Sequence, residues 1–164
     1  MSDLAVRRVE PSDRTVMERL WLLFRHDMSE FQGQLPAPDG SYRSEWLEKV
    51  LTGDAAWAGY LISLGNNPVG FCFMRALQQP VRVLNAFFMV RPVRRSGLGL
   101  RAVQEVLSQH PGPCEVAFQD NNEKAVRFWQ RVATEVSGDV WTQERRPIPG
   151  RPEAKPDVWI SFKV

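Results

Sequence analysis

Arg94, Gly97 and Gly99 form the most informative chemical pattern of the chain. They lie where an apolar run at residues 83–90 ends and a helical pattern begins at Leu98. Glycines let a ligand approach the backbone closely, and a helix N-terminus carries partial positive charge. A turn of this kind can bind an anion through its backbone N–H groups, and phosphate is a common occupant.

A second pattern begins at Asn122, which opens a helical stretch containing Ala125, Phe128 and Trp129. Each pattern has a structural alternative, because the glycines suit a plain tight turn and Asn122 or Asn121 suits a helix N-cap. The combination favours a phosphate site over a plain turn. A nucleotide site is less favoured, because no Gly-Lys-Ser/Thr triplet follows the glycines.

With these motifs the chain resembles the GNAT family of acyl-CoA-dependent N-acyltransferases, from about Leu4 to the C-terminus. The resemblance implies acetyl-CoA as the cofactor, with the glycine turn on the pyrophosphate of coenzyme A and Asn122 facing the pantetheine arm. The segment 24–31, together with Gly40-Ser41-Tyr42 and the Phe128-Trp129 pair, resembles less specifically a poorly characterised bacterial branch of predicted acetyltransferases. The implied coenzyme-binding residues are Phe88, Met89, Val90, Arg94, Arg95, Ser96, Gly97, Leu98, Gly99, Asn122, Ala125 and Trp129.

Two positions at which this family commonly handles protons hold other residues. Trp129 stands where a tyrosine often protonates the departing thiolate, and Ala86 stands where a glutamate is often found. An indole is not an acid at any useful pH, so we expect Trp129 to shape the site instead. The two departures make a non-catalytic acyl-CoA-binding or regulatory module the alternative to an enzyme.

Acidic residues elsewhere are candidates for the missing proton acceptor. Asp27 and Glu30 lie with His26 in a segment dense in ionisable groups, and Glu115 opens the strand that follows the glycine-turn helix. Asp120, at the end of that strand, is a lesser candidate. The structural alternative for the segment around Asp27 is a capped and solvated helix end.

The reaction implied by the resemblance is acetyl transfer to a primary amine. A neutral amine would attack the thioester directly, and backbone N–H groups around Phe88 to Val90 would stabilise the developing oxyanion. The partner is expected to be a small-molecule or peptide amine. An antibiotic, a polyamine, an amino acid and a protein terminus all stay open as acceptors.

The composition fits one domain spanning 1–164 with a sizeable core, because 43% of the 164 residues are hydrophobic. A net charge of +2 gives no indication of a nucleic-acid partner, and no apolar stretch is long enough to span a membrane. The N-terminus lacks the apolar core of a signal peptide, and Cys72 and Cys114 are expected to be buried thiols. We therefore expect a cytoplasmic protein, whereas a homodimer stays open. His26 and His110 are too few and too separated to indicate a metal site.

These residues fit an α/β fold, a GNAT-like mixed central β-sheet flanked by helices in the order β-α-α-β-β-β-α-β-α-β-β. The strands on either side of the glycine-turn helix should be parallel neighbours, because a crossover joins them. Val16, Leu20, Leu23 and Phe24 should form one buried stripe, and the proline-rich segment 145–156 should be a loop. The expected strands are 4–9, 57–64, 69–77, 83–90, 114–119, 140–143 and 158–162, and the expected helices are 13–25, 42–51, 98–109 and 122–134.

Overall fold

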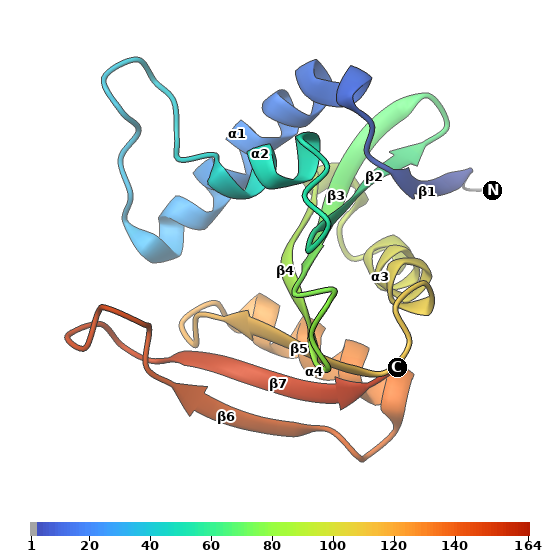
Figure 1. Cartoon of the computed structure of the whole chain (residues 1–164), viewed down its shortest axis with the longest axis vertical. Helices are drawn as coiled ribbons and strands as arrows, with labels where there is room; N and C mark the ends of the chain where they lie inside the picture. Colours follow the sequence, from blue (N-terminus) through green and yellow to red (C-terminus); the bar gives the residue numbers. More distant parts are fainter. Residues whose placement is uncertain (1–2) are drawn as a thin grey trace.

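Seven strands form one mixed sheet in the computed structural model of the chain, which describes residues 3–164 (Figure 1). The order across the sheet is β1-β2-β3-β4-β5-β7-β6, and only β4 and β5 are parallel neighbours. The predicted α/β class and the predicted parallel pair are therefore confirmed. The strands are β1 (Leu4–Arg8), β2 (Ala58–Leu64), β3 (Asn67–Arg75), β4 (Arg82–Met89), β5 (Pro113–Phe118), β6 (Thr142–Arg146) and β7 (Asp157–Lys163).

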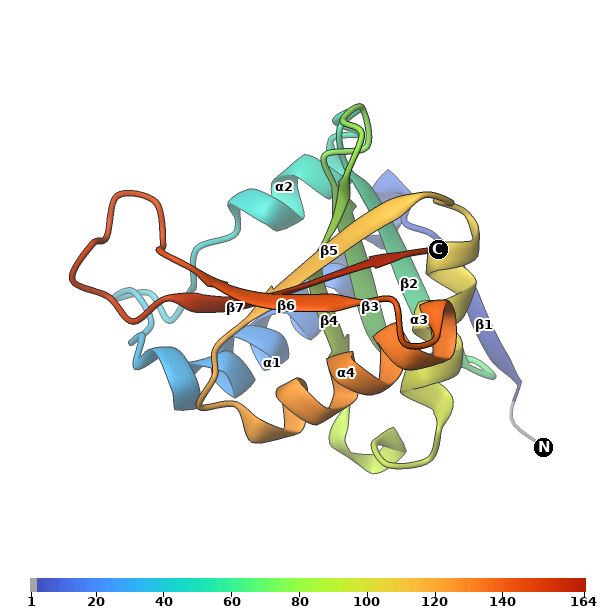
Figure 2. The same cartoon turned by 90° about the horizontal axis from the view of Figure 1, so that it is seen from below.

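The helices cover the two faces of this sheet in pairs (Figures 1 and 2). One pair, α1 and α2, packs with the phenylalanine-rich face of β3 and β4 in one buried cluster. The other pair, α3 and α4, packs on the opposite face from β2 across to β7 in a second cluster. The helices are α1 (Arg14–Gln32), α2 (Glu45–Leu51), α3 (Leu98–Ser108) and α4 (Glu123–Ser137), with short 3-10 turns at Pro11–Asp13 and Arg91–Val93.

Strand β7 has one face in the core and one face turned away from it. Val158, Ile160 and Phe162 are buried in the cluster that includes α4. Trp159 and Ser161 alternate with them and are only partly buried, so they point to the opposite face of the sheet. Because α1 and α2 pack against β3 and β2, this face of β7 is left for other contacts.

Helix α1 is longer than the sequence predicts. The expected end near Arg25 is wrong, since the helix continues to Gln32 and ends at Gly33, which has a φ of 67°. The N–H of Gly33 donates to the carbonyl oxygen of Ser29 at 2.9 Å, a C-cap that glycine makes without steric cost. The apolar stripe continues through Met28, which packs against the cluster of α1 and α2, but the charged residues around it hid this continuation in the sequence.

The buried stripe of α1 is also displaced by one residue from the prediction. Met17, Leu20, Trp21 and Phe24 are buried, whereas Leu23 is 51% exposed. These buried positions follow the i, i+3, i+4, i+7 spacing of one helix face. The large ring of Trp21 fixes that face, because it stacks on Phe73 of the sheet at 5.9 Å between ring centroids.

Strands β4 and β5 diverge soon after they begin. Their pairing consists of Arg82 with Cys114, Val83 with Glu115 and Leu84 with Val116. Beyond these pairs β4 stays bonded to β3 as far as Met89, and β5 stays bonded to β7 as far as Phe118. We call the resulting opening, between residues 85–89 of β4 and 117–118 of β5, the fork.

A β-bulge at Asn85 lies where the fork begins. Phe73 pairs with Ala86 and Met74 pairs with Leu84, so Asn85 is the extra residue in β4. A bulge bends its strand and increases the local twist. The bend turns β4 away from β5 and opens the fork.

The remaining elements differ from the prediction mainly at their ends. The second helix begins at Glu45 instead of residue 42, and β6 covers Thr142–Arg146 instead of 140–143. Cys72 and Cys114 are buried free thiols, and burial raises the pKa of Cys114 to about 12. Within residues 3–164, no helix has the length and apolarity needed to cross a membrane, and no group of His, Cys, Asp and Glu could hold a metal ion.

Candidate active site

The turn between β4 and α3 presents backbone N–H groups to solvent. Gly97 is the N-cap of α3 with a φ of 82°, and Arg95 also has a positive φ of 62°. Across residues 3–164 the N–H groups of Arg95, Ser96 and Gly97 find no hydrogen-bond acceptor. The N–H of Gly99 lies in the first helical turn, where no intrahelical partner exists. The turn therefore fits the pyrophosphate of a coenzyme.

Side chains of the turn support its shape. The Ser96 hydroxyl donates to the Val93 carbonyl oxygen at 2.5 Å and lies 3.4 Å from the Leu98 nitrogen, which makes Ser96 a local brace. A Cβ added to Gly99 would lie 3.5 Å from the ring of Phe128 and 3.6 Å from that of Phe87. The glycine therefore brings the start of α3 close to these rings.

Arg94 links the turn to two other elements. Its Nε donates to the carbonyl oxygen of Met89 at 2.8 Å, and a terminal nitrogen pairs with the Asp27 carboxylate of α1 at 2.7 Å. Its guanidinium also lies 5.6 Å from the ring centroid of Phe88. Arg91 approaches the same Asp27 carboxylate at 3.4 Å. Arg94 is thus held by α1 and β4, and Asp27 is part of an ion-pair group.

The backbone of β4 offers two amides to the fork, and one of them lies within the predicted range of Phe88 to Val90. The N–H of Val90 donates to the Val69 carbonyl oxygen at 2.8 Å, so it faces β3. Phe88 pairs with Phe71 in the same phase of the antiparallel ladder and also faces β3. The amides of Phe87 and Met89 point the other way, into the fork. Within the predicted range of Phe88 to Val90, only the amide of Met89 therefore faces the fork, and the second amide is that of Phe87.

Asn122 begins α4 and is 8% exposed. Its Oδ1 accepts a hydrogen bond from the N–H of Ala125 at 3.2 Å, so the N-cap alternative applies to Asn122 and not to the exposed Asn121. The N-cap role uses only the oxygen of the side chain. The amide nitrogen makes no hydrogen bond within residues 3–164, so it can still face a coenzyme.

Trp129 belongs to an aromatic group at the fork. It meets Phe87 edge-on at 5.8 Å and Phe128 edge-on at 4.9 Å, and those two rings stack at 5.4 Å. Trp129 is 7% exposed, and its indole N–H has no acceptor in the described part of the chain. The position of the common tyrosine is thus a packed aromatic surface with one free donor.

Comparison with known proteins identifies the chain. Residues 18–133 match the acetyltransferase (GNAT) family. This chain belongs to the GNAT acetyltransferases. Acetyl-CoA is the acyl donor of that family, and the free N–H groups of the turn beside α3 fit its pyrophosphate.

Solved GNAT structures share the whole fold at low sequence identity. An acetyltransferase from Thermus thermophilus is 17% identical with a TM-score of 0.68, and the match covers 98% of this chain and 97% of that one. An aminoglycoside acetyltransferase in complex with coenzyme A is 16% identical with a TM-score of 0.65, over 98% and 95% of the two chains. The ribosomal alpha-N-protein acetyltransferase RimL, also with coenzyme A, is 13% identical with a TM-score of 0.69, over 98% and 94%. No curated protein sequence matches the chain.

The position of the frequent GNAT glutamate is apolar in this chain. Ala86 is 5% exposed and lies in the cluster that α1 and α2 form with Phe71, Phe73 and Phe88. A carboxylate among these rings would lose its hydration without gaining a charged partner. Position 86 therefore offers no proton acceptor in this chain.

The structure does not bring the predicted acidic candidates together. Glu30 and His26 are exposed on α1, and Asp27 is paired with the arginines of the glycine turn. Glu115 is held by Arg146 and by the Ser161 hydroxyl. The Arg146 guanidinium is the main cause that lowers the pKa of Glu115.

Two further points argue against Glu115 of β5 and against Asp120, in the turn after β5, as bases. Glu115 is level with Val83, in the part of the sheet where β4 and β5 are still paired, so it lies at the closed end of the fork. Asp120 is bound by Arg145 and by Lys155 at 3.2 Å, and Arg145 is the main cause that lowers its pKa. A carboxylate with a lowered pKa and cationic partners is a poor proton acceptor.

Sequence reasoning missed Asp157, the first residue of β7. Its carboxylate is partly buried and forms neither a hydrogen bond nor an ion pair with any of residues 3–164. Burial alone raises its pKa. The signal was the alternation of Val158, Ile160 and Phe162, which places Asp157 on the non-core face.

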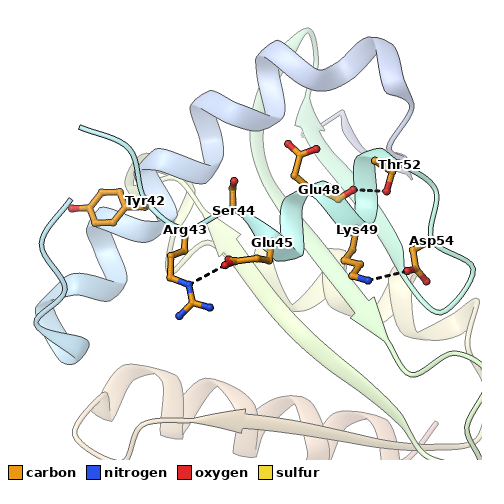
Figure 3. A pocket seen from close by; sticks show the side chains of 8 residues that line it. All are labelled: Tyr42, Arg43, Ser44, Glu45, Glu48, Lys49, Thr52 and Asp54. Carbon is orange, nitrogen blue, oxygen red and sulfur yellow. Dashed lines mark hydrogen bonds and ion pairs between the residues drawn. The ribbon is translucent and has the colours of Figure 1, made fainter. Parts of the chain in front are cut away.

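A groove of about 610 Å³ follows α2 away from the fork (Figure 3). Its polar side chains are paired, with Arg43 on Glu45 at 3.1 Å and Lys49 on Asp54 at 3.3 Å. No lining residue comes from β4, β5, α3 or α4. The groove is a solvated helix face and not the reaction centre. Its lining residues are Tyr42, Arg43, Ser44, Glu45, Glu48, Lys49, Thr52 and Asp54.

Proposed function

We propose that this GNAT acetyltransferase transfers the acetyl group of acetyl-CoA to a primary amine of a small molecule or a peptide. The fork between β4 and β5 is the observation that carries this proposal. It opens beside the free N–H groups of the glycine turn and exposes the two amides of Phe87 and Met89. A thioester held there would meet an amine arriving from the non-core face of β5 and β7.

Residues of three elements would hold the coenzyme. The N–H groups of Arg95, Ser96, Gly97 and Gly99 would bind the pyrophosphate, with the positive end of α3 behind them. The other residues proposed to contact coenzyme are Met89, Arg94, Leu98, Asn122, Ala125 and Trp129, whereas the amides of Phe88 and Val90 are used by β3. Acetyl-CoA supplies an acyl group on a thiolate leaving group.

Groups of the chain itself would then position the amine and stabilise the developing oxyanion. The amides of Phe87 and Met89 are donors fixed in advance by the β3–β4 ladder, so they can stabilise a developing oxyanion without reorganising. The rings of Phe87, Phe128 and Trp129 line the fork and exclude water from one side. Holding the amine beside the acyl carbon contributes more than any one proton transfer, about 7–11 kcal/mol.

The acceptors of the solved relatives differ from one another. One relative is an aminoglycoside acetyltransferase and another is a ribosomal alpha-N-protein acetyltransferase. At identities of 16% and 13% they support the fold and not a particular amine. We also propose that residues 1–164 form one domain, which the single seven-stranded sheet supports. A cytoplasmic location stays a prediction, and a homodimer stays open.

Thiol release measured against a panel of primary amines tests the function. We expect the wild-type protein to release coenzyme A thiol with at least one amine of the panel. Coenzyme binding without thiol release from any amine would instead support the non-catalytic acyl-CoA-binding alternative.

Gly97→Glu tests where the coenzyme binds. A carboxylate in the turn would repel the pyrophosphate, and we expect calorimetry to show a loss of coenzyme A affinity of about 100-fold or more, or about 2.8 kcal/mol. Gly97→Ala adds the same left-handed strain, about 1–2 kcal/mol, without charge, and should keep most of the affinity.

A second control tests whether the effect depends on the place of the substitution in the glycine turn, and not on backbone strain and added charge alone. Gly65 is also left-handed, with a φ of 60°, and has open space around it in the β2–β3 hairpin, so Gly65→Glu should leave binding unchanged. Equal affinities of the Gly97→Glu and Gly97→Ala proteins would contradict the assignment.

A further inference from the structure

Asp157 begins β7 on the face of the sheet that α4 does not cover. Val158 and Ile160 point into the core beside α4, so Asp157 and Trp159 share the opposite face. The carboxylate is neither fully exposed nor fully buried. It is therefore partly withdrawn from water and still open to a ligand on that face.

The strand ladder places Asp157 at the open end of the fork. Val158 pairs with Phe118, the last residue of β5, so Asp157 lies one residue beyond the end of that ladder. Strand β5 has already left β4 after Val116. Glu115, by contrast, pairs with Ser161 and lies at the closed end. Figure 2 shows the start of β7 beside the end of β5.

Charged groups on every element next to Asp157 are engaged elsewhere. On β6, its register partner Arg146 binds Glu115 and Glu144 and lies over the Trp159 ring at 4.7 Å. Beyond β5, Asp120 forms ion pairs with Arg145 and with Lys155, which lies in the loop before β7. Within residues 3–164, no cation lies within ion-pair distance of the Asp157 carboxylate. The carboxylate is thus free to accept a proton or to meet an ammonium group.

We propose that Asp157 is the general base that accepts the proton of the acceptor amine. This inference rests on the proposed function, because it assigns a residue to the same amine transfer. The reaction forms the amide N–C bond and breaks the C–S bond of the thioester, whose electron pair stays with sulfur. The amine proton moves to a carboxylate oxygen of Asp157, and water protonates the thiolate.

The surroundings suit this task. Burial without a cationic partner raises the pKa of Asp157, which makes its carboxylate a stronger base than the ion-paired Glu115 or Asp120. A positioned general base is worth about 10²–10⁴-fold in rate. The same lack of partners means that a neutral side chain should be tolerated at this position without loss of stability.

Asp157→Asn tests the proposal, with Asp157→Glu as the conservative variant and Glu144→Gln as the matched control. We expect Asp157→Asn to lower kcat about 100-fold or more, to keep wild-type coenzyme A affinity by calorimetry, and to raise Tm. Asp157→Glu should recover part of kcat. Glu144→Gln removes a carboxylate from the same face of neighbouring β6, and should keep the wild-type rate.

The pH profile separates a base from a merely structural residue. Wild-type kcat/KM should fall in acid as Asp157 becomes protonated. Asp157→Asn should lose that limb and keep only the rise of about tenfold per pH unit that both proteins share, because in both only the neutral amine attacks the thioester.

Three results would contradict the assignment of Asp157 as the general base or the proposed function on which it rests. An active wild-type protein whose Asp157→Asn variant keeps both kcat and the pH profile would exclude Asp157 as base and leave the proposed function standing. An Asp157→Asn variant with a lowered Tm and weakened coenzyme binding would make Asp157 structural. A wild-type protein that releases no thiol with any amine would refute the proposed function itself.

Discussion

At the scale of single residues, Trp129 shows how this chain departs from the usual GNAT pattern. Its ring is packed against Phe87 and Phe128, so it contributes surface to the fork and one unused N–H. The leaving thiol of coenzyme A should have a pKa near that of cysteine, about 8.5, so its thiolate departs without a strong acid. An acid at this position is therefore dispensable in principle.

Substitutions of Trp129 test that reasoning. Trp129→Phe keeps an aromatic surface and should keep most of the activity, whereas Trp129→Ala should cost about 3–5 kcal/mol of folding free energy, as for other buried aromatic residues. Trp129→Tyr should leave kcat unchanged if water protonates the thiolate. Steady-state kinetics and chemical denaturation of the three variants measure these effects, and a Tyr variant faster than wild type would show that the missing acid limits turnover.

At the scale of elements, α1 and the glycine turn are joined through Asp27 and Arg94. The residues are 67 positions apart in the chain, and the ion pair brings the last turns of α1 onto the coenzyme site. The sequence suggested that Asp27 is a candidate proton acceptor for the amine and not part of the coenzyme site. The ion pair reverses that expectation, because Asp27 offsets positive charge that would otherwise act on the pyrophosphate.

Asp27→Asn should therefore raise coenzyme A affinity, by about two- to tenfold in low salt, with the gain shrinking as salt is added. The loss of folding free energy should stay within about 1 kcal/mol, because both side chains are partly exposed. Calorimetry at two salt concentrations measures the effect. Glu30→Gln, on the same helix but exposed, is the matched control. Weaker coenzyme binding by Asp27→Asn would mean that Asp27 orients Arg94 for the phosphate instead.

Elements set by local sequence could be predicted, and those set by distant contacts could not. The glycine turn and the parallel strands follow from turn chemistry and from the crossover rule. The full length of α1 was missed because charged residues interrupt the apolar stripe in its last turns. The phase of the β4 amides was missed because it depends on which edge pairs with β3. That Asp157 lacks a partner could not be predicted, because it depends on where Arg146 and Lys155 reach in space.

At the scale of the whole molecule, stability should change with pH in a direction set by a few carboxylates. Asp13 accepts two hydrogen bonds from Arg7 at 2.8 Å and one from the Glu10 N–H, and the Arg7 bonds are the main cause that lowers its pKa. A lowered carboxyl pKa stabilises the fold above the unfolded value and stops doing so as pH falls through the folded value.

Asp13→Asn should thus destabilise the protein at pH 7 by about 1–2 kcal/mol, and this effect should shrink in acid as pH falls through the lowered pKa of Asp13. The ionised carboxylate of Asp157 contributes to stability with the opposite sign. Its pKa is raised by burial, so the charged form is unfavourable in the fold. Its neutral variant should gain stability at pH 7 and lose that gain in acid. Denaturant unfolding at the two pH values measures both, and parallel pH curves for wild type and Asp13→Asn would contradict the assignment.

The short contact between β4 and β5 makes β4 an interior strand along one side and an edge strand along the other. Amide protons of Phe88 and Val90 are locked into the ladder with β3, whereas those of Phe87 and Met89 should exchange with solvent almost as in a loop. Unpaired strand edges recruit foreign chains and promote aggregation. The coenzyme-free protein therefore exposes an aggregation-prone strand edge at the fork. Bound coenzyme should cover this edge and lower the tendency of the protein to aggregate.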